Sequence, residues 1–250
     1  MTRSSAPPPG YDAWSLGAGG AVARHDVADA VRGALAAAGS LYAWAAAQPG
    51  RDAFTGRGAT YGVRLGGVAA VVRHARRGGL LGPLLGDRYL GAPRVLRELA
   101  WSRRLADAGI ATPAVLAGVW RRTGLVHRAD VATERVAGAD LAAILFGDAP
   151  PAGAARAALL HAVGGLVRRL HAAGFVHPDL QLRNVLVAPG PPPAAWLLDV
   201  ESCRASAGAA DATRNLARFY RSWAKWNRLN GPRLTAADRA AFEAGYREPA

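Results

Sequence analysis

The stretch over residues 175–187 constrains this chain more than any other part of its sequence. It places His177, Asp179 and Asn184 between two short apolar runs of β-forming residues, and after a proline-rich turn a third apolar run ends at Asp199. Short apolar runs bounded by turn residues are consistent with buried strands. The pattern therefore predicts a loop between strands that brings three oxygen-bearing side chains to one site.

The spacing of these side chains matches the catalytic loop of protein kinases. That loop reads H-R-D-L-x-x-x-N, and the segment 177–184 departs from it only at Pro178. Phosphoryl transfer is catalysed mostly by positioning and by neutralising phosphate charge. We therefore expect Asp179 to accept the proton of an attacking hydroxyl, while Asn184 and Asp199 bind Mg²⁺ beside the phosphates of ATP. His177 is expected to support the loop.

Composition limits the class of protein further. The chain has 250 residues, enough for one large domain or two small lobes around one cleft. Cys203 is its only cysteine, which excludes an intrachain disulfide and cysteine-rich zinc sites and suits a reducing compartment. The positive charges come almost entirely from arginine, because Lys225 is the only lysine. The net charge of +13 favours an anionic partner. The basic pairs are scattered without interleaved aromatic residues, so no nucleic-acid partner is expected.

The N-terminal region has the composition of an extension that precedes the main fold. Residues 1–20 are rich in Pro, Gly and Ser, and we expect a flexible tail there rather than a signal peptide. Residues 27–47 predict a helix or a helix pair. No apolar run approaches the roughly 18 residues of a membrane span, so we expect a soluble or peripherally attached protein. The extension and a nucleotide-binding N-lobe are expected over 21–137, and a helical C-lobe with the catalytic loop over 138–250.

Glycines and one arginine mark the expected nucleotide site of the N-lobe. Gly56 and Gly58 lie between two predicted antiparallel strands, and glycine lets backbone amides approach phosphate oxygens closely. We expect that turn to cover the nucleotide. The following strand ends at Arg73, where protein kinases carry a lysine that clamps phosphate. Arg73 is the expected substitute, and Arg64 competes with it for this role.

Glu98 is the expected ion-pair partner of Arg73. It is the first acidic residue of a helix predicted over 94–108 by its apolar spacing. Two further strands are predicted over 114–136. Glu134 lies near their end, at the expected hinge between the lobes, where backbone groups would meet the adenine of ATP.

Helical patterns dominate the second half of the chain. The stretch 154–173 carries a broad apolar stripe and is expected to be the buried helix that leads into the catalytic loop, with His171 supporting that loop. After Asp199 no glycine completes D-F-G and no A-P-E follows, so the activation loop of regulated protein kinases is absent. Two more helices are predicted over 211–228 and 235–247. The expected fold class is α+β, a two-lobed protein-kinase-like fold with a small antiparallel-sheet N-lobe and a mainly helical C-lobe.

From about residue 56 to 226, the chain resembles the bacterial lipopolysaccharide kinase family, especially the 3-deoxy-D-manno-octulosonic acid (Kdo) kinases. The resemblance is most specific in the segments 72–80, 87–89, 97–98, 177–184 and 215–218. It implies a kinase, peripheral on the cytoplasmic face of the bacterial inner membrane, that moves the γ-phosphate of ATP to a Kdo hydroxyl of an anionic glycolipid, a lipid A precursor. It also implies that Asp179 is the base, that Asn184 and Asp199 bind Mg²⁺, and that Arg73 clamps phosphate. No obligate protein partner is predicted.

The sequence leaves two other functions open. Aminoglycoside-type kinases share the His-x-Asp and Asn pattern, so the acceptor could be another small molecule or a protein. The irregular basic insert over 74–91, with Arg76 and Arg77, is either a solvated loop or a loop that receives an anionic acceptor. The other function is a nucleotide-binding pseudokinase. The presence of Asp179, Asn184 and Asp199 argues against a pseudokinase, and the lack of an N-lobe lysine argues weakly for one.

Overall fold

Two structural units divide the chain in the computed structural model, which describes residues 7–54, 59–75, 89–90, 93–124, 126–188 and 190–248. The first unit contains residues 1–100 and 114–135, and the second contains 101–113 and 136–250. The boundary expected between 137 and 138 lies close to the change of unit after Arg135. The assignment of 101–113 to the second unit was not predicted. The fold is a mixed α+β fold, as expected.

An antiparallel sheet forms the first unit. Its described strands follow the order β1 (Tyr11–Leu16), β2 (Gly19–Arg24), β7 (Val115–Thr123), β8 (Val126–Glu134), β5 (Val68–His74), β4 (Thr60–Leu65) and β3 (Asp52–Phe54), with β6 (Tyr89–Leu90) beside β8. The flexible tail expected over 1–20 is wrong from Tyr11 onward, because β1 and β2 form a hairpin whose second strand pairs with β7. The hydroxyl of Tyr11 also donates a hydrogen bond to the carbonyl of Val115 at 2.7 Å.

Helices cover the two faces of this sheet. The helices α1 (Ala28–Ala38) and α2 (Leu41–Ala47) confirm the helix pair expected over 27–47 and pack on one face. The first turns of α4 (Arg94–Asp107) pack on the other face through Val95 and Leu99. The close approach of α4 requires glycine at position 118, since a Cβ atom there would lie 2.0 Å from a methyl group of Val95.

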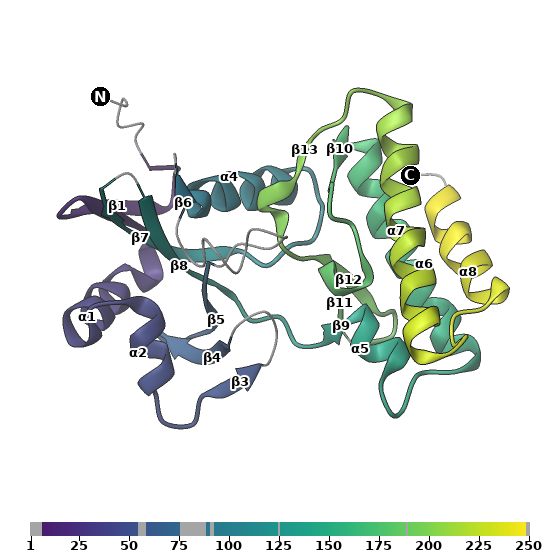
Figure 1. Ribbon diagram of the computed structural model, residues 1–250, viewed down its shortest axis with the longest axis horizontal. Helices are drawn as coiled ribbons and strands as arrows, with labels where there is room; N and C mark the ends of the chain where they lie inside the picture. Colours follow the sequence, from purple (N-terminus) through teal and green to yellow (C-terminus); the bar gives the residue numbers. More distant parts are fainter. Residues whose placement is uncertain are drawn as a thin grey trace. The chain divides into compact units, whose positions relative to one another are not determined.

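Four α-helices lie wholly within the described part of the second unit, in addition to the end of α4. They are α5 (Leu141–Phe146), α6 (Gly153–Ala172), α7 (Ala209–Asn230) and α8 (Ala236–Arg247) (Figure 1). The expected apolar stripe of α6 lies buried at the centre of the core, where Leu160, Val163 and Leu166 have no exposed surface. The helices α6 and α8 pack so closely that a Cβ atom at Gly164 would lie 2.0 Å from the carbonyl oxygen of Phe242. None of the helices in the described ranges is long and apolar enough to cross a membrane.

Short strands hold the segment that the sequence singled out. The strand β11 (Val185–Ala188) lies between β12 (Ala194–Leu197) and β9 (Ala139–Asp140), and β10 (Phe175–Val176) pairs with β13 (Arg204–Ala205). These strands include the three apolar runs that flank the expected catalytic loop. The loop therefore begins and ends on strands anchored in the core of the second unit.

Candidate active site

The loop between β10 and β11 takes its shape from alternating burial. Leu180 and Leu182 have no exposed surface and belong to the core, whereas 36% of the Asp179 side chain remains exposed. The backbone closes two turns, because the amide of Leu180 donates to the carbonyl of His177 and the amide of Asn184 donates to that of Gln181, each at 2.9 Å. The buried leucines thus fix the loop while Asp179 faces outward.

Three side chains hold the carboxylate of Asp179. Arg218 on α7 donates from Nη2 to Oδ1 at 2.5 Å, and Gln181 donates from Nε2 to Oδ2 at 3.0 Å. Asn184 donates from Nδ2 to the carbonyl of Asp179 at 2.8 Å and to Oδ2 at 3.3 Å. A carboxylate with donors on both oxygens has a fixed orientation, and the guanidinium of Arg218 compensates part of its charge.

Asp199 is joined to the same loop through the residue before it. The amide of Leu198 donates to the carbonyl of Asn184 at 2.9 Å, and the carbonyl of Leu198 accepts from Nε2 of His177 at 3.0 Å. Asp199 itself has φ 58° and ψ 42°, a left-handed conformation that Asp and Asn adopt more readily than most residues. The structure therefore brings Asp179, Asn184 and the backbone that presents Asp199 together.

His177 is a buried support of the loop. It has no exposed surface, and Asn215 on α7 binds its backbone on both sides, donating from Nδ2 to the His177 carbonyl at 2.5 Å and accepting from the His177 amide at 3.2 Å. Oδ1 of Asn215 also contacts Nε2 of His171 at 3.0 Å. The expectation that His171 supports the loop is thus confirmed, through Asn215 rather than by direct contact.

Burial keeps His177 neutral. Desolvation lowers the pKa of its imidazole and outweighs the hydrogen bond to Leu198 and the nearby negative charges of Asp199 and Asp179, which act in the opposite direction. Because a carbonyl accepts the hydrogen bond from Nε2, the neutral ring carries its proton there. His177 therefore fixes the position of Leu198 and of the Asp199 backbone.

The same burial predicts that acid destabilises the fold well before the carboxylates titrate. Desolvation lowers the pKa of His171 below 6.5, as it does for His177, so the unfolded chain binds more protons than the folded chain just below that pH. We expect the free energy of unfolding to fall from about pH 6.5 downward, as measured by urea unfolding between about pH 7.5 and about pH 5.5. This window is distinct from that of the ion-paired Asp211, whose pKa the hydrogen bond from Arg204 holds below 3.8.

His161 provides the control for that measurement. It lies on α6 like His171, but 44% of its side chain is exposed. His171→Asn should flatten the dependence of unfolding free energy on pH more than the control His161→Asn does. A slope that is the same in wild type and His171→Asn contradicts the prediction.

The first unit contains the expected ion pair. Nη2 of Arg73 on β5 donates to Oε1 of Glu98 on α4 at 2.6 Å, which confirms the predicted pairing. Only 6% of the Glu98 side chain is exposed, compared with 29% of Arg73. Arg64 instead donates to the carbonyl of Gly67 within its own hairpin. The structure thus favours Arg73 over Arg64 as the arginine held in place by a buried carboxylate.

Other expected site residues are placed only in part. Glu134 is the last residue of β8, and its amide donates to the carbonyl of Ala114 at 2.8 Å. Gly56 and Gly58 lie outside the described residues, although the antiparallel strands β3 and β4 on either side of them match the expected hairpin. Most of the basic insert, including Arg76 and Arg77, also lies outside the described residues.

The expected magnesium ligands offer oxygen atoms of the right kind. Because Nδ2 of Asn184 makes the contacts to Asp179, Oδ1 of Asn184 remains as an acceptor, and no described residue donates a hydrogen bond to it. Asp199 supplies a carboxylate. In the described part of the chain no cluster of three or more His, Cys, Asp and Glu could hold a metal. An amide oxygen and a carboxylate suit Mg²⁺, which commonly takes few protein ligands and completes its shell with substrate phosphates and water.

Two residues of α7 escaped the sequence reasoning. Asn215 and Arg218 were included only as the ends of the resembling segment 215–218, yet both contact the loop. Their spacing of three residues places them on one face of a helix, which was the available signal. Nothing local in the sequence indicated which segment that face would contact.

Comparison with known proteins finds one matching family and several similar proteins. The model of the lipopolysaccharide kinase (Kdo/WaaP) family matches residues 43–246. Similar proteins include three named 3-deoxy-D-manno-octulosonic acid kinase. The one from Vibrio vulnificus is 35% identical over 68% of this chain and 72% of its own length. The one from Photobacterium profundum is 32% identical over 78% and 81%, and the one from Actinobacillus succinogenes is 37% identical over 76% and 82%.

Proposed function

Because the chain belongs to the lipopolysaccharide kinase (Kdo/WaaP) family, we propose that it transfers the γ-phosphate of ATP to a Kdo hydroxyl on a lipid A-type glycolipid. Membership makes the chain a kinase with a protein-kinase-like fold. The proposal adds the nucleotide, the acceptor and the roles of individual residues. The observation that supports it most is the set of contacts that joins Asp179, Asn184 and the residue before Asp199 in one loop.

In the proposed mechanism Asp179 accepts the proton of the acceptor hydroxyl as that oxygen attacks the γ-phosphate. Gln181 and Arg218 hold the carboxylate in one orientation. Such positioning of reacting groups is a main contribution of a protein to phosphoryl transfer. Asn184 and Asp199 hold Mg²⁺, which when bound neutralises phosphate charge. Arg73, oriented by Glu98, binds phosphate oxygens with its guanidinium.

The proposed acceptor also suits the charge of the chain. A net charge of +13 produces a positive field that attracts phosphate and carboxylate groups, both of which a Kdo-bearing lipid A precursor carries. We propose that the protein meets this acceptor as a peripheral protein on the cytoplasmic face of the inner membrane. The arginine-rich composition would favour an anionic membrane surface for the same reason.

An acceptor panel tests the proposed function. Purified protein is incubated with Mg-ATP and one acceptor at a time: a Kdo-bearing lipid A, the same lipid A without Kdo, an aminoglycoside, and a basic protein substrate. Mass spectrometry should find one added phosphate on the Kdo-bearing lipid alone. Phosphate on another acceptor, or on the lipid without Kdo, would assign a different kinase activity. No transfer to any acceptor would favour a nucleotide-binding pseudokinase.

Arg218 provides a separate prediction, as a residue that positions Asp179. Its guanidinium contacts Asp179 Oδ1 at 2.5 Å, so Arg218→Gln should lower kcat by about 10²-fold through loss of orientation, with the KM for ATP little changed. Arg218→Lys retains the charge and should recover part of kcat. The control is Arg221→Gln, which removes an exposed arginine from the same helix. Equal kcat for Arg218→Gln and Arg221→Gln contradicts the positioning role.

A further inference from the structure

One side of α7 carries a regular row of basic residues. Cations recur every three or four residues, at Arg214, Arg218, Arg221, Lys225 and Arg228. This spacing follows the helical repeat, so the five positions lie within an arc of about 80° and extend over about 21 Å of the helix. We call this row the α7 basic face. The only acidic residue of the helix is Asp211, which is buried in the first turn.

The first two cations of the α7 basic face are bound to carboxylates. Arg214 contacts Asp211 and Arg218 contacts Asp179, each at 2.5 Å. The second contact joins this face to the proposed catalytic base, whose side chain is 36% exposed. The catalytic loop therefore borders the α7 basic face.

The last three cations of the face carry charge that the described residues do not neutralise. Arg221, Lys225 and Arg228 are exposed, and their side chains form no ion pair or hydrogen bond within the described part of the chain. The catalytic loop adds another exposed cation, because the guanidinium of Arg183 lies 5.5 Å from the centroid of the Trp226 ring on α7. Like charges three or four residues apart destabilise a helix, and an anionic surface would compensate for them.

Apolar surface lies next to these cations. Leu229 directly follows Arg228 and is 64% exposed, more than any other large hydrophobic residue in the described ranges. Trp226 is partly exposed and packs against Phe146 of α5, with ring centroids 5.3 Å apart. Basic residues beside exposed leucine and tryptophan suit the boundary between lipid headgroups and acyl chains.

We propose that the α7 basic face is the surface through which this protein binds an anionic phospholipid membrane. Lipid phosphates contact Arg221, Lys225 and Arg228, and Leu229 reaches the acyl boundary. Because Arg218 joins the same face to Asp179, binding there brings the catalytic loop to the lipid surface, where a glycolipid acceptor presents its sugar. The statement about the acceptor rests on the proposed function, whereas lipid binding itself does not.

Vesicle co-sedimentation of the full-length protein tests this surface without kinase activity. Vesicles of phosphatidylcholine alone are compared with vesicles that contain phosphatidylcholine and phosphatidylglycerol in equal parts. We expect binding to the second kind only, and we expect it to weaken as salt is added. The triple variant Arg221→Gln/Lys225→Gln/Arg228→Gln should bind about 10²-fold more weakly, because each basic residue near an anionic surface contributes about fivefold to affinity.

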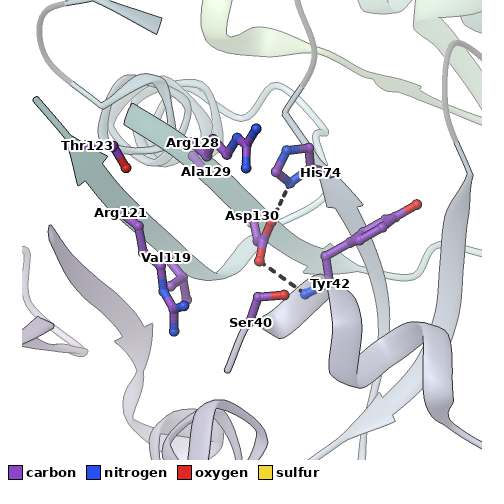
Figure 2. Close-up of a pocket in the computed structure, with 9 residues that line it drawn as sticks. All are labelled: Ser40, Tyr42, His74, Val119, Arg121, Thr123, Arg128, Ala129 and Asp130. Carbon is purple, nitrogen blue, oxygen red and sulfur yellow. Dashed lines mark hydrogen bonds and ion pairs between the residues drawn. The ribbon is translucent and has the colours of Figure 1, made fainter. Parts of the chain in front are cut away.

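The matched control removes the same charge from the first unit. Arg51, Arg121 and Arg122 are exposed, and Figure 2 shows Arg121 on β7. If only the overall positive field attracted the membrane, Arg51→Gln/Arg121→Gln/Arg122→Gln would weaken binding as much as the α7 variant does. We expect the control to bind within about threefold of wild type, because charges farther than a Debye length from the lipid are screened. Equal affinities of the two triple variants, or no binding of wild type to anionic vesicles, would overturn the proposal.

A nucleic-acid arm tests the other polyanion that could occupy a basic helix face. Binding of a fluorescent single-stranded oligonucleotide is measured for wild type and the α7 triple variant. An α7 variant that loses oligonucleotide binding but keeps its affinity for anionic vesicles would overturn the proposal and assign the face to nucleic acid.

Transfer assays relate the α7 basic face to the proposed function. With a detergent-dispersed Kdo-bearing lipid, kcat of the α7 triple variant should equal that of wild type, since Arg218 and Asp179 are unchanged. With the same lipid in anionic vesicles, transfer by the variant should fall in proportion to its loss of binding. Wild type that binds anionic vesicles but transfers no phosphate would contradict the proposed function and leave the membrane surface supported.

Discussion

Replacing Asp179 by asparagine should lower kcat for phosphoryl transfer by about 10²–10⁴-fold, the usual contribution of a general base. Asparagine keeps the size of the side chain and one acceptor oxygen for Arg218, so the loop should retain its position. Nδ2 of Asn184 donates to the backbone carbonyl of residue 179, so this contact does not depend on the replaced side chain and is also retained. The variant should therefore fold normally and bind Mg-ATP with wild-type affinity while transferring little phosphate.

Steady-state kinetics with a separate nucleotide titration measures this outcome. Asp148→Asn, at an exposed position in the same unit, is the control for losing one carboxylate and should behave like wild type. If Asp179→Asn retains wild-type kcat, the proposed base is wrong. A fall in nucleotide affinity equal to the fall in kcat/KM would instead indicate that Asp179 acts in binding.

The second large effect is expected at Asp199. Asn at this position can adopt the left-handed conformation with φ 58° and ψ 42°, so the backbone should not change. The substitution removes the only charged ligand proposed for Mg²⁺. We expect kcat to fall by about 10³-fold and the Mg²⁺ concentration for half-maximal activity to rise at least about tenfold.

A magnesium titration of activity provides the measurement, with circular dichroism melting to verify the fold. Asp199→Gly is the matched variant, because glycine also accepts the left-handed conformation but offers no side-chain oxygen. It should be at least as impaired as Asp199→Asn. Activity and magnesium dependence that remain at wild-type levels in both variants would exclude Asp199 as a metal ligand.

Local sequence patterns predicted the elements that local interactions define. The apolar stripe of α6, the helix that carries Glu98, and the strands around 177–184 each show a period or boundary within a short window, and all are present. The pairing of Arg73 with Glu98 could be predicted because a known motif relates a strand-end cation to a helix acid. These predictions needed no knowledge of which distant segments meet.

Long-range contacts account for what was missed. The sequence predicted a flexible tail over 1–20 because that stretch is rich in Pro, Gly and Ser. The place of the β1–β2 hairpin in the sheet depends on β7, and Tyr11 and Val115 are separated by 104 positions. Arg218 reaches Asp179 across 39 positions. Such pairings follow from the packing of whole elements, which no short window of sequence contains.

Asp179 and Asp199 are proposed to act in one phosphotransfer site, and the decisive experiment is single-turnover transfer from Mg-ATP to the Kdo-bearing lipid. Rates are compared for wild type, Asp179→Asn, Asp199→Asn and the double variant, each with nucleotide and acceptor in saturating amounts. Residues that act as a unit have non-additive effects. We expect rapid transfer by wild type, and a double variant that is no slower than the slower single variant. Losses that multiply in the double variant, or no transfer by wild type, would contradict this proposal.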